Sequence, residues 1–210
     1  MPRAMGVDEA GRGAVLGPLV VAGVVAEGSV RSELRRLGAQ DSKAVARSQR
    51  REILRRLVRQ VEGSWAIVFS ASQVDNCSLT QLEETAVCAL MHRLGPEQLV
   101  IDAPVGPAAV PALLRRLRSS ATAPVEIAAY PKADISDPLV GAASLLAKVV
   151  RDGYLHALRA QYGDIGWGYP GEKKVYHFLT SWLAEHGQLP PICRTRWASV
   201  QALISPTLSL

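Results

Sequence analysis

The sequence has few aromatic residues, few cysteines and no long apolar run. Aromatic side chains make up 5% of the 210 residues, and there are three cysteines. Cys77, Cys88 and Cys193 are widely spaced and form no Cys-x-x-Cys pair, which argues against a disulfide framework or a zinc knuckle. The longest apolar stretch, residues 15–26, is broken by Gly-Pro and is shorter than the ~20 residues that a membrane helix needs. We therefore expect no membrane span.

Two further signals are missing from the sequence. Acidic residues appear by position 8 without an apolar signal region before them, so we expect a cytoplasmic protein. No Gly-Lys-Ser/Thr phosphate loop occurs, which argues against an NTPase. The glycines at 11, 13 and 17 could be mistaken for a dinucleotide fingerprint, but Pro18 and the β-branched run after it do not predict the required helix.

The charge balance is basic. Lys and Arg number 24 against 19 Asp and Glu, a formal net charge of +5. This suits a polyanionic partner, although most arginines stand at helical spacing and are typical of solvated helix faces. Eight of the eleven aromatic residues lie between Tyr154 and Trp197, where they are available for packing or for stacking on bases.

The hydrophobic pattern predicts an α/β fold. Two β-rich stretches near the N-terminus predict a hairpin, and amphipathic and apolar segments then alternate as helices and strands. The sheet is therefore expected to be covered on both faces, with a helical C-terminal segment from Lys173. The expected strands are 5–7, 19–26, 65–70, 99–101 and 125–129, and the expected helices are 48–61, 78–94, 107–117 and 140–158.

A pair of acids leaves the first strand beside a glycine-rich loop. Asp8 and Glu9 are adjacent, and adjacent strand residues point to opposite faces, so a turn has to redirect Glu9 if both acids meet one metal. The following loop, residues 11–13, carries Arg12 between two glycines, so its backbone can approach a phosphate or a ribose hydroxyl closely. A polar turn between two strands explains these residues equally well when they are taken alone.

Two more acids stand where predicted strands end. Asp102 follows an apolar strand, and Asp134 lies after another strand and shortly before a helix. Asp137 competes with Asp134, although its position before Pro138 is typical of a turn at the start of a helix. Each acid alone is typical of a cap or turn, but together such carboxylates are the oxygen ligands that Mg²⁺ or Mn²⁺ prefers.

The motifs together resemble the type 2 ribonucleases H. Asp8-Glu9-Ala10-Gly11-Arg12-Gly13, with a Gly-Pro and an apolar run behind it, looks like the opening motif of that family. The ordered matches span residues 5 to 200. The later blocks are Asp41-Ser42-Lys43, Val100-Ile101-Asp102, Lys132-Ala133-Asp134, Ser144 to Lys148 with Arg151-Asp152, and Gly168-Tyr169-Pro170.

Some positions indicate which branch of the family the sequence resembles, and others differ from the family's usual motifs. Ala133 and the ending from Pro190 to Trp197 look like the archaeal branch. The first motif stands near the start of the sequence, which favours type 2 over the type 3 enzymes with their added N-terminal domain. Val45 and Gly171-Glu172 depart from the usual blocks, which leaves the acids intact but weakens the inference of substrate contacts near Lys43 and Tyr169.

The resemblance implies a ribonuclease H-like mixed central sheet flanked by helices, with a catalytic domain over 1–165 and a C-terminal helical segment over 166–210. It implies an endoribonuclease that hydrolyses the RNA strand of RNA·DNA hybrids and nicks 5′ of ribonucleotides embedded in duplex DNA. It further implies that two divalent ions, Mg²⁺ or Mn²⁺, perform this chemistry and leave 5′-phosphate and 3′-hydroxyl ends. The implied catalytic and metal residues are Asp8, Glu9, Asp102 and Asp134, and the implied substrate residues are Gly11, Arg12, Gly13, Lys43 and Tyr169.

Alternative interpretations remain for parts of the sequence. A non-catalytic nucleic-acid-binding module suits the basic charge and the aromatic residues, but gives no reason to gather carboxylates where a phosphate must lie. Cys88 and His92 stand one helical turn apart, which is more typical of a helix's own packing than of a metal pair. Residues 201–208 resemble a sliding-clamp peptide only weakly, because the anchoring aromatic pair is missing. We expect a monomer.

Overall fold

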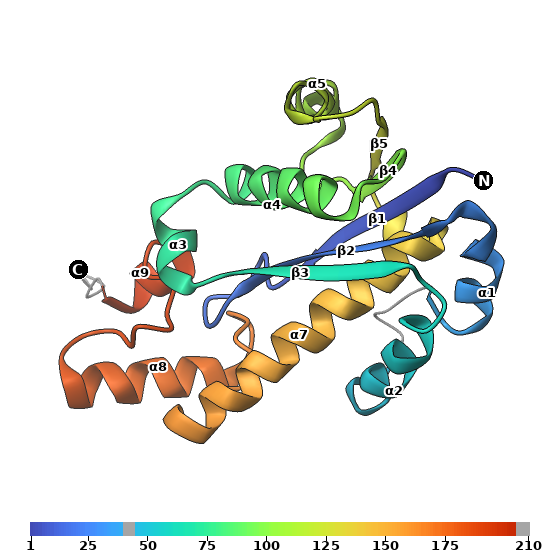
Figure 1. Ribbon diagram of the computed structural model, residues 1–210. Helices are drawn as coiled ribbons and strands as arrows, with labels where there is room; N and C mark the ends of the chain where they lie inside the picture. Colours follow the sequence, from blue (N-terminus) through green and yellow to red (C-terminus); the bar gives the residue numbers. More distant parts are fainter. Residues whose placement is uncertain (40–44, 205–210) are drawn as a thin grey trace. The chain divides into compact units, whose positions relative to one another are not determined.

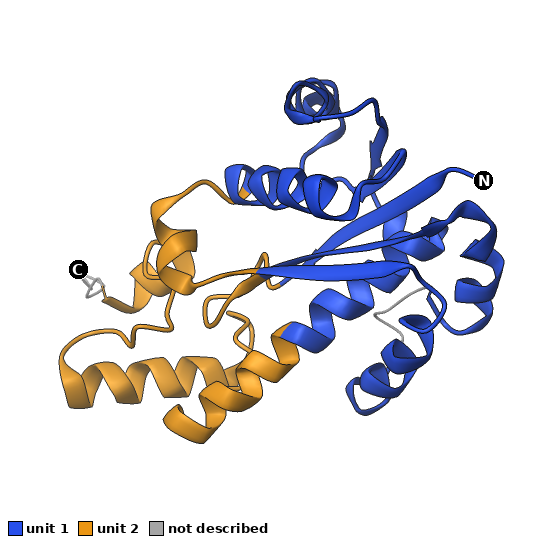
Figure 2. Cartoon of the chain, viewed as in Figure 1, with its two compact units in different colours: residues 1–10, 20–67, 80–150 blue, residues 11–19, 68–79, 151–210 orange. Residues whose placement is uncertain are grey.

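The computed structural model describes residues 1–39 and 45–204, so Lys43 and the end of the weak clamp-like segment lie outside the described residues. The chain divides into two compact units (Figure 2). Unit 1 contains residues 1–10, 20–67 and 80–150, and unit 2 contains residues 11–19, 68–79 and 151–210. The segment 166–210, predicted as a C-terminal helical segment that packs on the catalytic domain and carries Tyr169, falls in unit 2 together with the glycine-rich loop.

A five-stranded sheet lies at the centre of unit 1, with the strand order β3-β2-β1-β4-β5 (Figure 1). β1 and β2 pair antiparallel, from Arg3 opposite Glu27 to Ala10 opposite Val20. β4 runs parallel to both β1 and β5. The mixed α/β sheet expected from the sequence is confirmed. The strands are β1 (Arg3–Ala10), β2 (Leu19–Glu27), β3 (Gly63–Phe69), β4 (Gln98–Asp102) and β5 (Glu126–Tyr130).

Helices cover both faces of this sheet (Figure 1). On one face, buried residues of β1 and β2 such as Ala4 and Val24 form a core with Leu34, Leu57 and Leu139 of α1, α2 and α7. α4 and α5 cover the other face. The helices concerned are α1 (Arg31–Arg36), α2 (Arg47–Leu57), α4 (Leu79–Leu94), α5 (Val110–Ser120) and α7 (Pro138–Tyr162), with short elements η1 (Gly28–Val30), η2 (Pro107–Ala109) and α6 (Ala133–Ser136) between them.

The alternation along β1 decides which side chains face which helices. A Cβ on Gly6 would lie 2.2 Å from the carbonyl carbon of Leu139, so even-numbered positions face α7. A Cβ on Gly23, which pairs with Val7, would lie 3.3 Å from Leu90, so odd-numbered positions of β1 face α4. Asp8 and Glu9 therefore start on opposite faces of the sheet.

Unit 2 is mainly helical, as expected for the C-terminal region. Its core gathers Leu16, Leu155, Leu179 and Val200 from segments far apart in the sequence. Leu16 forms an antiparallel bridge with Cys193, which joins the glycine-rich loop to the C-terminal region. Its helices include α3 (Ala71–Asn76), α8 (Lys173–His186) and α9 (Ala198–Ile204). The second half of α7, from Arg151, also belongs to this unit. Within the described residues, no helix is both long and apolar enough to cross a membrane.

Candidate metal centre

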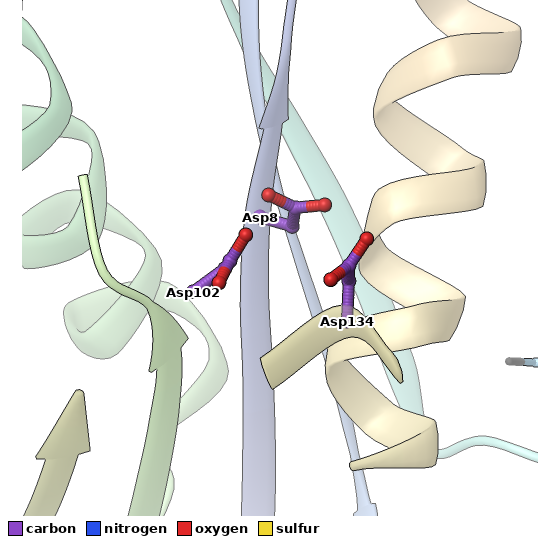
Figure 3. Close-up of side chains that lie close together, drawn as sticks. All are labelled: Asp8, Asp102 and Asp134. Carbon is purple, nitrogen blue, oxygen red and sulfur yellow. The ribbon is translucent and has the colours of Figure 1, made fainter. Parts of the chain in front are cut away.

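Three of the four predicted acids meet in unit 1. Asp8, Asp102 and Asp134 each offer a carboxylate oxygen, and these oxygens lie within 4.8 Å of one another (Figure 3). β1 and β4 are parallel and pair Val7 with Ile101, so the next residue on each strand is an aspartate on the same face. The register of two parallel strands thus places Asp8 beside Asp102.

The third acid is positioned by a turn after β5. Lys132 adopts a left-handed conformation with φ 61°, and α6 begins at the next residue. Asp102 accepts a hydrogen bond from the main-chain N–H of Ala133 through Oδ1 at 3.0 Å, which ties the turn to the end of β4. Asp134 follows directly and is buried, with 3% of its surface exposed. The competing acid, Asp137, instead accepts from the N–H of Leu139 at 2.8 Å and so begins α7 as a capping residue.

Burial makes Asp8 unusually easy to protonate. The side chain is 6% exposed, and desolvation is the largest cause that raises its pKa to about 6. Hydrogen bonds from Ser144 and from the N–H of Glu9 lower the pKa, Asp102 raises it, and Lys148 lowers it. Without a cation, the cluster therefore resists carrying all of its negative charge.

α7 contributes a polar pair beside Asp8. Lys148 Nζ donates to Ser144 Oγ at 2.9 Å, and the Ser144 side chain hydrogen-bonds to Asp8. An ammonium group can only donate, so the Ser144 oxygen accepts from Lys148 and its hydroxyl proton is left for Asp8. This chain of donors gives the Asp8 carboxylate a fixed orientation. In the sequence, Ser144 and Lys148 belong to a block that resembles the family, but the pattern does not indicate their place beside the acids.

Glu9, the fourth predicted acid, is not among the three acids whose carboxylate oxygens lie within 4.8 Å of one another. β1 continues through Ala10, so no turn redirects Glu9, and its side chain lies on the α4 face. Glu9 also lines a small cavity with Asp8, Asp102 and the buried Glu83 of α4. The Glu9 main chain still contacts the cluster, because its N–H donates to Asp8 Oδ1 at 2.7 Å.

Glu83 was missed by the sequence reasoning. It is 3% exposed, although glutamate is seldom fully buried. In the sequence it stands next to Glu84 in an amphipathic helix, where the pattern indicates a solvated face rather than a site. Only the packing of α4 over β1 and β4 places it near the acids.

The donor set suits a hard divalent cation. Three carboxylates whose oxygens lie within 4.8 Å of one another repel each other unless a cation or a proton compensates their charge. Carboxylate oxygens are the usual protein ligands of Mg²⁺ and Mn²⁺. The residues present therefore fit a divalent metal.

The predicted substrate residues described by the structure lie in unit 2. Gly11 has φ 89°, and a Cβ on it would lie 2.2 Å from Arg151 Nε, whereas a Cβ on Gly13 would meet nothing within 4 Å. Tyr169 is 37% exposed. Its N–H donates to the Glu172 carboxylate at 3.1 Å, and the N–H of Trp167 donates to the same carboxylate at 2.8 Å. Glu172, a departure from the expected block, thus holds the main chain around the tyrosine.

Comparisons with known proteins place this architecture in one family. The family model described as Ribonuclease HII matches residues 5–200. The ribonuclease HII of Pyrococcus abyssi is 37% identical over 203 residues, which cover 94% of this chain and 89% of that protein. The crystal structure of ribonuclease H2 from Pyrococcus horikoshii has a TM-score of 0.87 at 31% identity and covers 96% of both chains. The ribonuclease HII solved in complex with PCNA from Archaeoglobus fulgidus has a TM-score of 0.83 at 33% identity, covering 92% of this chain and 94% of that one.

Proposed function

The chain belongs to the ribonuclease HII family, and from that premise we propose that it nicks duplex DNA on the 5′ side of a single embedded ribonucleotide. Family membership makes the protein an endoribonuclease that acts on RNA–DNA hybrids. The proposal adds the type of junction and the residues that perform the cut. The observation that carries it is the group of three buried or half-buried aspartates at the ends of β1 and β4 and the start of α6.

We propose that Asp8, Asp102 and Asp134 hold two divalent ions. Glu9, which lines a cavity with Asp8 and Asp102, is the proposed fourth ligand. Bound Mg²⁺ or Mn²⁺ supplies water activation and charge stabilisation at the leaving 3′ oxygen, and so yields 5′-phosphate and 3′-hydroxyl ends. The protein's own contribution is orientation. Ser144 and the N–H of Glu9 hold the Asp8 carboxylate, and the N–H of Ala133 holds Asp102.

The same cluster argues against a module that only binds nucleic acid. A phosphodiester carries negative charge, so carboxylates gathered at its binding site weaken binding unless a cation lies between them. A binding module gains nothing from such an arrangement, whereas hydrolysis requires it. The basic net charge of +5 supports approach of the polyanion in either case.

Selectivity for a ribonucleotide depends on the 2′-OH, the group that distinguishes RNA from DNA. We assign its recognition to the Gly-Arg-Gly loop of residues 11–13 and to Tyr169. The exposure of Tyr169 and the open space around Gly13 support this assignment. Lys43 remains a proposed phosphate contact and lies outside the described residues.

A sliding-clamp contact is a further part of the proposal. The Archaeoglobus fulgidus relative was solved in complex with PCNA. Residues 201–208 are the candidate segment in this chain, and the lack of an aromatic pair there predicts weak binding by a monomeric enzyme. Binding of immobilised sliding clamp by the full chain, but not by a chain ending at residue 200, would support this contact.

The decisive experiment uses a labelled DNA duplex with one ribonucleotide, incubated with Mg²⁺, with Mn²⁺ or with chelator. We expect metal-dependent nicking 5′ to the ribonucleotide by the wild type and a loss of at least about 100-fold in Asp102→Asn, with fold retained. Cleavage of longer RNA tracts alone would remove the proposed role of Tyr169. Normal nicking by Asp102→Asn would remove the metal assignment.

A further inference from the structure

Two arginines in unit 2 are almost completely buried, and the chemistry at the acids does not use them. Arg194 is 0% exposed and Arg151 is 3% exposed. Arginine is seldom buried to this extent, because removing a guanidinium group from water is costly unless hydrogen bonds replace the lost hydration. Here main-chain carbonyl oxygens replace it. These carbonyls belong to Arg12, to residues 16–18 that follow the Gly-Arg-Gly loop, and to Trp167, two residues before Tyr169.

Arg151 joins the glycine-rich loop to the tyrosine segment. Its Nε donates to the carbonyl of Pro18 at 3.2 Å, and Nη2 donates to the carbonyl of Leu16 at 3.1 Å. Nη1 and Nη2 both donate to the carbonyl of Trp167, each at 3.2 Å. Its Cζ also lies 5.1 Å from the ring centroid of Tyr169. Arg151 therefore contacts both the residues that follow the Gly-Arg-Gly loop and the segment that carries Tyr169.

Arg194 holds the loop from its other end. Nε and Nη2 donate to the carbonyl of Gly17 at 3.3 and 3.2 Å, and Nη1 donates to the carbonyl of Arg12 at 3.2 Å. The main-chain N–H of Arg194 donates to the carbonyl of Val15 at 2.8 Å. The peptide at the centre of the Gly-Arg-Gly loop is thus tied directly to a buried cation.

Two glycines let the backbone close on Arg151. Gly11 has φ 89°, and a Cβ there would lie 2.2 Å from Arg151 Nε. Gly168, next to the tyrosine, has φ 85°, and a Cβ there would lie 3.1 Å from Arg151 Nη2 and 2.6 Å from the carbonyl oxygen of Leu16. The Gly168 carbonyl in turn accepts from the N–H of Val15 at 2.7 Å. The loop and the tyrosine segment are therefore packed around the guanidinium group.

We propose that Arg151 and Arg194 are positioning residues that hold the Gly-Arg-Gly loop and Tyr169 together as one rigid site for recognition of the ribose 2′-OH. The inference rests on the proposed function. A guanidinium group offers several donors in a fixed plane and can bridge separate carbonyls, whereas a lysine ammonium is a single flexible point charge. Hydrogen bonds to a 2′-OH depend on short distances and narrow angles, so loosening either segment weakens discrimination before it weakens phosphate binding.

The test compares two substrates with the same enzyme. The kcat/KM for a duplex with one ribonucleotide is divided by the kcat/KM for a full RNA–DNA hybrid, for the wild type, Arg151→Lys and Arg194→Lys. Leu179→Ala is the matched control, because it removes a buried core side chain of unit 2 that has no part in these hydrogen bonds. All assays run well below the melting temperature of each variant. The shift in melting temperature caused by Mn²⁺ is measured separately and reports on metal binding by the acids.

We expect Arg151→Lys to lower the selectivity ratio about tenfold or more, Arg194→Lys to lower it as well, and Leu179→Ala to leave it unchanged. The response to Mn²⁺ should persist in all three. For Arg151→Ala, methylguanidinium should restore part of the ratio and methylammonium should not, because only the planar guanidinium group can bridge the separate carbonyls. The unchanged ratio in Leu179→Ala separates this effect from a general loss of stability.

Two failures are distinguishable. If the wild type does not nick at a single ribonucleotide, the proposed function fails and the inference falls with it. If the wild type nicks but both lysine variants keep the wild-type ratio, as Leu179→Ala does, the positioning role alone is overturned. Should Arg151→Lys not fold, Arg194→Lys and the rescue of Arg151→Ala decide the question.

Discussion

At the scale of single residues, Asp8 shows a conflict between folding and function. A carboxylate suited to a cation is buried where the metal-free protein would be more stable without its charge. The raised pKa means that the native state binds a proton more readily than the unfolded chain. Between pH 3.8 and about 6 the native state holds the extra proton, so stability falls as pH rises through that range.

Asp8→Asn should therefore stabilise the metal-free protein. The amide keeps an acceptor for the Ser144 hydroxyl and removes the buried charge. A pKa raised from 3.8 to about 6 corresponds to up to about 3 kcal/mol. Thermal melts in chelator should show the variant above the wild type at pH 7 and the difference shrinking toward pH 4. Asp164→Asn is the control, because its exposed carboxylate pairs with Lys174 and its loss should not stabilise. A variant less stable than the wild type at pH 7 would contradict this account of Asp8.

The sequence could predict which acids belong to the site, and only the packing could show how they are held. Asp8, Asp102 and Asp134 stand at or after the ends of the strands predicted from the sequence, so their convergence was expected. Glu83 could not be foreseen, because one glutamate in an amphipathic helix looks like any solvated residue. The placement of Glu9 on the α4 face also depends on β1 continuing through Ala10, which is a matter of strand length rather than of residue type.

At the scale of elements, the close approach of α7 to β1 positions the polar pair beside Asp8. The approach requires Gly6, because a Cβ there would lie 2.2 Å from main-chain atoms of Leu139 and Val140. The sequence predicted both elements but not their distance, since a glycine in a strand indicates many things besides a crossing helix. The same holds for Gly11 and Gly168 in unit 2, where positive φ and close contacts were visible only in the structure.

Gly6→Ala should accordingly lower the free energy of unfolding by about 3 kcal/mol or more, because backbone atoms cannot yield as a flexible side chain can. The matched substitution is Gly153→Ala, an exposed helical position of α7 where a Cβ meets nothing within 4 Å. It should raise stability by roughly 0.5–1 kcal/mol through helix propensity. Urea denaturation of both variants measures the pair, and equal stability of the two would contradict the close crossing of α7 and β1.

At the scale of the whole molecule, metal binding should reverse the pH dependence of stability. A cation at the cluster needs Asp8 ionised, so it competes with the proton whose pKa is raised to about 6. A ligand that binds only the native state stabilises it in proportion to the logarithm of its concentration over its dissociation constant. The stabilisation by a divalent ion must therefore grow as pH rises through about 6. The metal-free protein, in contrast, becomes less stable as pH rises from 3.8 to about 6.

We expect millimolar Mn²⁺ or Mg²⁺ to raise the melting temperature clearly at pH 8 and little at pH 5, with a smaller effect at both pH values in Asp102→Asn. Calorimetric titration in two buffers of different ionisation enthalpy should show proton release near pH 6. Ionic strength has to be held constant, since a chain of net charge +5 responds to salt as well. An equal rise in melting temperature at pH 5 and pH 8 would mean that the ions bind elsewhere, because only ligands that lose a proton in this range can make the effect depend on pH.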